Sequence, residues 1–415
     1  MGQRLEIPLF NFWSLFMMKK TLVAMAAIAT TASFAQTVTL TGRGQMEYST
    51  FAATGSVTAA NDYNLRNRLA DNGSRITFAV SENLGGGLTA GVYCETGFNM
   101  DNGAANGQGN ISNSSTSEWC SRESRLSIGN DTAVLRLGRQ NVYWSQGELN
   151  DTGANKVGID VSSNVFLNHG AAGGPTRVNN VMKVVLGKNV GAFAGTEIYT
   201  AVDGSNESAA AGIEPSTRGK NPVGFTLKYA ISPALVSQID YYSQSNTPTS
   251  TSVSSFDRTM TRWGLGYKYA PGSIVSGQYY TNERTDVTLA TNSYRITGDT
   301  GPTAVVNTGS AKNSGYILNL NHNFGGNFTA VAMYTRAGNI TTGQSGAELA
   351  DSGVVGYTLG GMYRLSKRTH LYAAASTLQN GINANTNLSG GGQAAGTVSF
   401  GSTVSVTNFG LQHNF

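Results

Sequence analysis

The sequence has little charge, two cysteines and, beyond its first 35 residues, no long apolar run. Charged residues make up 13% of the 415 residues, about half the share usual in soluble proteins. No stretch after Gln36 approaches the roughly 20 apolar residues of a membrane-spanning helix. Basic residues number 28 and acidic residues 24, and this balance argues against a nucleic-acid partner and against a polybasic membrane patch.

The start of the chain is typical of a secretory signal peptide. Residues 18–35, MKKTLVAMAAIATTASFA, combine two lysines, a short apolar run and a small-residue exit, which predicts cleavage before Gln36. The run is too short for a spanning helix, and a buried N-terminal helix is the alternative. Residues 1–17 fit no part of this scheme, which predicts a mis-annotated upstream extension, with translation beginning at Met17 or Met18.

The remaining chain, residues 36–415, alternates apolar and polar residues. In TRWGLGYKY, residues 261–269, Trp, Leu, Tyr and Tyr lie on one face, and Arg, Gly, Gly and Lys lie on the other. The segments VGFTLKYAI at 223–231 and VVGYTLGGMYRL at 354–365 follow the same rule. Strict alternation predicts strands with one apolar and one polar face.

Sixteen segments show this pattern, and their connections alternate between short and long. The predicted strands are 37–51, 74–82, 87–99, 119–129, 132–139, 178–188, 191–203, 222–231, 234–245, 258–270, 272–284, 312–324, 327–339, 353–366, 368–380 and 401–415. The long connections are 52–73, 100–118, 140–177, 204–221, 246–257, 285–311, 340–352 and 381–400. Short turns alternating with long loops are typical of outer-membrane barrels.

The fold class predicted is therefore all-β, a sixteen-stranded antiparallel transmembrane β-barrel with short periplasmic turns and long outer loops. Lipid cannot satisfy backbone hydrogen bonds, so the sheet must close on itself, with its apolar face outward and its polar face lining a water-filled lumen. A soluble β-sandwich is the alternative, but it needs fewer strands and no alternation of loop lengths.

Several segments resemble the general porins of β-proteobacteria, and together they span nearly the whole mature chain. They are GSRITFAVSENLGGGLTAGVYCETGFNMDNG (73–103), SRESRLSIG (121–129), VLRLGRQ (134–140), RVNNVMKV (177–184), YRLSKRTHLYAAAS (363–376) and NFGLQHNF (408–415). The resemblance implies a homotrimer that lets ions and small hydrophilic solutes diffuse across the outer membrane. It also implies contacts with outer-membrane lipid, lipopolysaccharide and the barrel-assembly machinery, without a cofactor.

The same resemblance implies that the third long loop, residues 140–177, folds into the barrel and narrows it. Selectivity of such a pore depends on its radius and on the charges that face the lumen. The candidate constriction residues are Arg43, Arg75, Arg125, Arg136, Glu148, Asp151 and Asp160. The candidate lumen-lining residues are Gln45, Glu47, Glu95, Lys183, Lys228, Arg262, Lys268 and Arg364.

Arginines opposite carboxylates would set a transverse field, and the cluster of fixed arginines suggests a mild anion preference. The alternative for each arginine is a structural pair with Glu95 or another wall carboxylate. An inward position is expected either way, because a charge on the lipid face costs roughly 2–4 kcal/mol at mid-membrane.

Three further features complete the prediction. Phe415 ends the chain on an aromatic residue and resembles the C-terminal signal by which outer-membrane barrels are recognised for insertion. Cys94 and Cys120 lie within bridging range on adjacent predicted strands, and the sequence leaves open a disulfide or two free thiols. No CxxC metal spacing occurs, and the four scattered histidines form no recognisable hydrolase array, so no enzyme, metal or cofactor is predicted.

The sequence leaves two other functions open. A substrate-selective channel would need a row of aromatic side chains along the lumen. A structural or adhesive barrel with a plugged lumen would conduct no current.

Overall fold

The computed structural model describes residues 36–101, 105–106, 119–142, 149, 157–159, 161–169, 177–201, 221–246, 256–286, 310–342, 347–390, 393–394 and 398–415. The predicted signal peptide and the upstream extension lie outside these residues. Within the described ranges, no helix has the length and apolar character needed to span a membrane.

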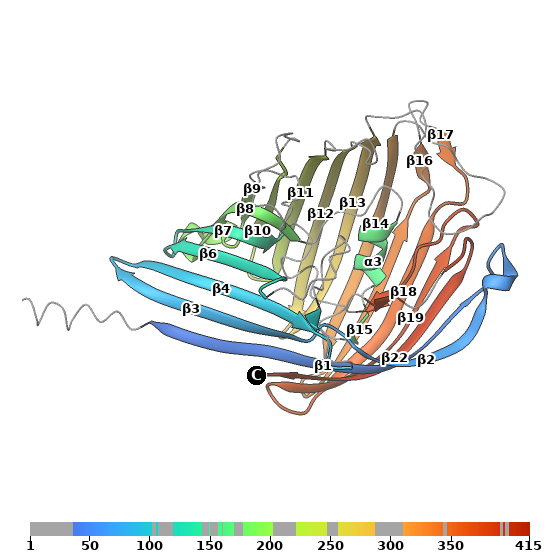
Figure 1. The fold of residues 1–415 in the computed structure, drawn as a ribbon, viewed down its shortest axis with the longest axis horizontal. Helices are drawn as coiled ribbons and strands as arrows, with labels where there is room; N and C mark the ends of the chain where they lie inside the picture. Colours follow the sequence, from blue (N-terminus) through green and yellow to red (C-terminus); the bar gives the residue numbers. More distant parts are fainter. Residues whose placement is uncertain are drawn as a thin grey trace, which may run out of the picture.

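The predicted sixteen-stranded antiparallel barrel is confirmed (Figure 1). Its sixteen positions, in the described part of the chain, are β1 (Thr37–Thr54), β2 followed by β3 (Tyr63–Asp71 and Arg75–Gly85), β4 (Leu88–Phe98), β6 (Glu123–Gly129), β7 (Ala133–Asn141), β8 (Arg177–Leu186), β9 (Glu197–Ala201), β10 (Val223–Ala230), β11 (Leu235–Asn246), β12 (Phe256–Ala270), β13 (Ser273–Asp286), β14 (Ser310–Asn323), β15 (Phe328–Ala337), β18 (Val354–Arg364), β19 (Thr369–Asn380) and β22 (Thr403–Asn414). Shorter pieces lie in the connections: η1 (Ala59–Asn61), β5 (Ala105–Asn106), α3 (Val161–Asn168), η3 (Lys188–Phe193), β16 (Ile340–Thr342), β17 (Ala347–Leu349), β20 (Ser389–Gly390) and β21 (Gln393–Ala394).

The first and last strands close the barrel. β1 pairs with β22 from Arg43↔Asn414 to Thr54↔Thr403, and β1 pairs on its other edge with β3 and β2. The backbone of Phe415 continues the closure: its N–H donates to the Gly42 oxygen at 3.0 Å and its oxygen accepts from the Gly42 N–H at 2.9 Å. The Phe415 ring covers Gly42, where an added Cβ would lie 2.2 Å from a ring carbon. Closure leaves no free sheet edge at this seam.

The two faces of the wall differ as the alternation predicts. On β22, Phe409 and Leu411 face outward and are 56% and 45% exposed, whereas Asn408 and Gln412 face inward and are 2% and 5% exposed. This is the polarity expected of a barrel in lipid, whose backbone hydrogen bonds are satisfied by the closed sheet.

The predicted loop at 52–73 is largely wrong. β1 extends to Thr54, and residues 63–71 form β2, which pairs with β1 and continues into β3 after three residues. Arginine and asparagine are frequent in β2, so its few apolar residues hid the strand. The predicted strand at 191–203 also begins too early, since η3 occupies Lys188–Phe193 and β9 starts at Glu197.

The two cysteines form a disulfide. Cys94 lies on β4 and Cys120 lies just before β6, with their Cα atoms 4.7 Å apart. The Cys120 N–H donates to the Thr96 hydroxyl at 2.8 Å. The bond therefore fixes the point at which the second outer loop returns to the wall.

Candidate pore constriction

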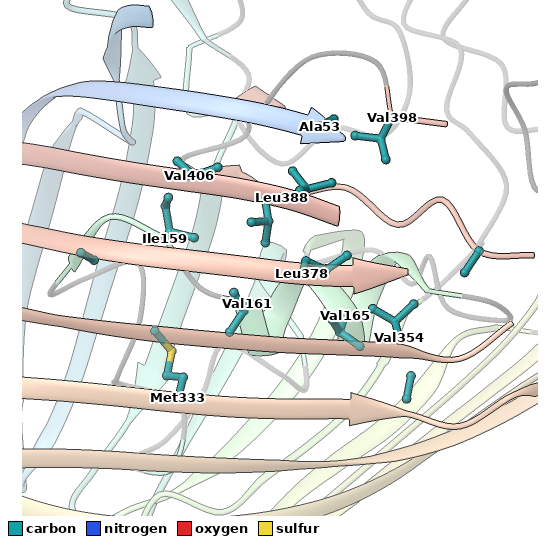
Figure 2. Packing of buried hydrophobic residues seen from close by; sticks show 14 of the residues in the cluster. Ala53, Ile159, Val161, Val165, Met333, Val354, Leu378, Leu388, Val398 and Val406 are labelled. Carbon is teal, nitrogen blue, oxygen red and sulfur yellow. The ribbon is translucent and has the colours of Figure 1, made fainter. Parts of the chain in front are cut away.

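We call the connection between β7 and β8, residues 142–176, the third loop; its described residues, 142, 149, 157–159 and 161–169, pack against the inner face of the barrel wall. Its helix α3 packs against β15, β18 and β19 (Figure 1). On this side Ile159, Val161 and Val165 are buried among apolar side chains of the wall (Figure 2). The wall side chains include Ala53, Met333, Val354, Leu378, Val404 and Val406. Lumen faces of such barrels are usually polar, so the loop that covers this apolar patch accounts for it.

The third loop also contacts β12, β13 and β14. The ring of Phe166, on α3, is 5.0 Å from the Tyr280 ring, and the guanidinium carbon of Arg262 is 5.1 Å from the Phe166 ring centre. Leu149 is 2% exposed and covers Gly266, where an added Cβ would lie 2.4 Å from a Leu149 methyl group. The Leu149 oxygen accepts hydrogen bonds from the side chains of Ser276, Gln278 and Asn319. The loop is thus fixed at several points of the wall.

A basic cluster surrounds Glu95 on the inner face of the first strands. The Arg122 Nε donates to Glu95 Oε1 at 2.6 Å, and the Arg75 Nε lies 3.5 Å from Glu95 Oε2. Arg177 is close enough to act on Glu95 electrostatically. Arg43 donates from Nε and Nη2 to the Gly73 oxygen at 3.2 and 3.0 Å, and it lies near Arg75 and Arg122. One carboxylate therefore sits among four guanidinium groups.

Further pairs continue along this wall. Arg125 forms an ion pair with Glu123, and its guanidinium carbon is 3.8 Å from the centre of the Tyr93 ring. The Lys183 ammonium donates to Glu197 Oε2 at 2.8 Å, and both side chains are at most 4% exposed. A cation paired with a carboxylate adds no net charge, so these two pairs neutralise part of the positive charge of this wall.

The structure places the sequence-predicted residues as follows. Buried on the inward face are Arg43, Gln45, Glu47, Glu95, Lys183 and Arg262. Half-buried are Arg75, Arg125, Arg136, Lys228 and Lys268, whereas Arg364 is exposed at the short-turn end of β18. Glu148, Asp151 and Asp160 lie outside the described residues. These three residues, the acidic side of the predicted transverse field, therefore stay a prediction from the sequence.

Several inward charges are taken up by structural pairs, as the alternative interpretation of the arginines expects. Arg262 donates to Asp240 Oδ2 at 2.8 and 2.6 Å, and Asp240 also accepts from Thr226 and Gln238. This network lies directly beneath Phe166, so Arg262 supports the third loop.

Sequence reasoning missed Arg122 and Arg177. Arg122 lies one residue before β6, so the strand alternation, which counted back from Arg125 would turn it outward, does not extend to it. Arg177 begins β8 on the parity of Lys183, and this signal could have identified it.

Comparison with known proteins identifies the family. Residues 21–383 match the family model for Gram-negative porins. The chain belongs to the Gram-negative porins. It is an outer-membrane porin that forms a diffusion channel, not an enzyme.

The chain is also similar to individual proteins, in sequence or in fold. The major outer membrane protein of Pasteurella multocida is 32% identical over 146 residues, which is 35% of this chain and 40% of that protein. The anion-selective porin from Comamonas acidovorans has the same fold, with a TM-score of 0.64 and 21% identity over 92% of this chain and all of the other. A Vibrio cholerae outer membrane protein, OmpT in its trimer form, matches with a TM-score of 0.57 and 12% identity over 92% of this chain and all of the other.

Proposed function

We propose that this porin is a homotrimer of passive pores through which anions pass more readily than cations. The observation that carries the proposal is the sign of the charge on the inner wall from β1 to β9. Cationic side chains that face it in the described residues include Arg43, Arg68, Arg75, Arg122, Arg125, Arg136, Arg177 and Lys183. Four carboxylates share it: Glu47, Glu95, Glu123 and Glu197.

The excess of fixed positive charge concentrates anions near the wall. A channel with low-dielectric walls lined by one sign of charge raises the local concentration of the opposite ion, and the effect weakens as salt rises. The Comamonas acidovorans porin is described as anion-selective, and the shared fold is consistent with the same preference here. Glu148, Asp151 and Asp160 on the third loop would supply the negative charges of the constriction, opposite the arginines of the wall.

The trimer is proposed from the family and from the trimer form of the Vibrio cholerae relative. Outward apolar side chains cover the wall of the single chain, and a subunit interface would cover part of them. Native mass spectrometry of detergent-purified protein is expected to show three chains per particle. A mass of one chain under conditions that preserve heat-resistant barrels would contradict the trimer.

The test of anion preference is the zero-current potential of the pore under a KCl gradient. The double variant Arg75→Glu with Arg136→Glu moves four units of charge on the wall and is expected to reduce the chloride preference or reverse it. Lys188→Glu is the matched control, because Lys188 is exposed on η3 and pairs with Asp131 away from this wall. Equal potentials for wild type and the double variant would overturn the assignment to these arginines.

A pore that carries no current would instead favour the structural or adhesive barrel. The proposal also includes contacts of the barrel with lipopolysaccharide and with the barrel-assembly machinery. Cleavage after residue 35 is also proposed, and N-terminal sequencing of the mature protein tests it.

A further inference from the structure

A network of buried polar groups joins the barrel seam to the third loop. It is centred on Glu47, which lies on β1, is 1% exposed and forms none of the ion pairs found among the described residues. Around it lie Asn72, between β2 and β3, Tyr372 on β19, and Asn408 on β22. We call these four residues the seam network.

Two asparagines link the Glu47 carboxylate to the backbone of the third loop. The Asn72 Nδ2 donates to Glu47 Oε2 at 2.6 Å and to the Gly158 oxygen at 2.8 Å. The Asn408 Nδ2 donates to the same carboxylate oxygen at 3.0 Å and to the Val157 oxygen at 2.8 Å. Both amide nitrogens therefore bridge the wall and the loop.

The carboxylate determines which way these amides face. An ionised carboxylate only accepts hydrogen bonds, and so does a backbone carbonyl. Between two acceptors, each asparagine must present its nitrogen, because a flipped amide would place oxygen against oxygen. The Tyr372 hydroxyl adds a third donor to Glu47 Oε2 at 3.1 Å, and the Gln45 Nε2 donates to that hydroxyl at 3.0 Å. Hydrogen bonds to a charged group are stronger than neutral ones, so Glu47 fixes the network.

The loop residue opposite the network has to be glycine. Gly158 has φ of +81°, a conformation that favours glycine. A Cβ added there would lie 2.4 Å from Glu47 Oε2, 2.6 Å from Asn408 Nδ2 and 2.7 Å from Asn72 Nδ2. A side chain at position 158 would therefore displace the polar ends of Glu47, Asn72 and Asn408.

We infer that Glu47 is a positioning residue: it orients Asn72 and Asn408 so that they hold the third loop at a fixed place in the lumen, and it is not a charge that permeating solutes meet. The inference rests on the proposed role of the third loop as the constriction. It reassigns Glu47 from lumen-lining to loop-holding.

The first test changes only the loop. Gly158→Ala inserts a methyl group into the seam network, whereas Gly191→Ala, on η3, also places a side chain at a positive φ, of +61°, but with no atom within 4 Å. We expect Gly158→Ala pores to spend about tenfold more time outside the main open level of single-channel records and to close at lower voltage. Gly191→Ala pores should behave as wild type. Loss of a hydrogen bond to a charged group changes an equilibrium by about this factor.

The second test separates hydrogen bonding from charge. Glu47→Gln keeps one acceptor oxygen for the asparagines, so its pores should show the single open level of wild type. Glu47→Leu removes both acceptor oxygens and should behave like Gly158→Ala. All variants are checked for a folded, heat-resistant barrel on gels. Folded Glu47→Leu and Gly158→Ala pores with wild-type open levels and closing voltages would overturn the inference, even with anion preference intact. A Glu47→Gln pore as unstable as Glu47→Leu would also overturn it. Absence of any current in the wild type would instead contradict the proposed pore.

Discussion

Removing the ring of Phe166 tests whether packing holds α3 in the lumen. This side chain is 1% exposed, and its ring packs at a steep angle on Tyr280 and against the Arg262 guanidinium. Truncation of a buried Phe to Ala costs about 3–5 kcal/mol in compact proteins. Each 1.4 kcal/mol is tenfold, so Phe166→Ala should shift the balance between docked and undocked loop by roughly a hundredfold or more. The hydrogen bond from the Asn282 side-chain amide to the Phe166 backbone oxygen is retained, so the helix keeps one attachment to the wall.

The assay is single-channel recording combined with limited proteolysis from the outer side. We expect Phe166→Ala pores to show several conductance levels and faster cleavage within the third loop. Phe193→Ala is the control, since Phe193 on η3 is 43% exposed and contacts Tyr229 at the short-turn end. If Phe166→Ala pores keep a single conductance level and wild-type resistance to cleavage, packing of this ring does not position the loop.

Three further predictions concern the disulfide, acid and the barrel seam. Replacing Cys94 and Cys120 with alanine should cost about 3.5 kcal/mol for a separation of 26 residues and lower the unfolding temperature in detergent; an unchanged temperature would contradict this. Burial lowers the pKa of His169 from 6.5 to about 4, so its stabilising contribution is complete above pH 6.5 and is lost as pH falls toward 4. Closures should therefore increase between pH 7 and 4.5 in wild type but not in His169→Gln, and equal responses would refute this. Gly42→Ala, whose methyl group would overlap the Phe415 ring, should reduce the yield of heat-resistant barrel on refolding, and a wild-type yield would show that the seam tolerates it.

The sequence predicts the barrel well because alternation with period two reports each strand directly. Trp263 and Tyr267 face outward and Arg262 inward, as their order in the chain requires. Alternation did not reveal β2, because pairing with β1 stabilises a segment whose own pattern is weak. Sheet pairing, which is a tertiary effect, decided that segment.

The interior of the pore is harder to predict, because partners come from distant parts of the chain. Nothing local in VSSNVFLN predicts α3, whose Val161 and Val165 lie one helical turn apart and pack on the wall. Alternation predicts that Glu47 faces inward, but only the structure shows that the backbone at Gly158 covers it. The pairing of Arg262 with Asp240 likewise depends on the register of β11 and β12.

The measurement that tests the central claim most directly is a single-channel recording of the purified wild-type protein in a planar bilayer, with its zero-current potential under a KCl gradient. An open trimeric pore predicts discrete current steps that arrive in groups of three. The basic wall around Glu95 predicts a zero-current potential whose sign reports a preference for chloride. A potential of the opposite sign would show that the arginines do not control permeation, and the absence of steps would contradict an open pore.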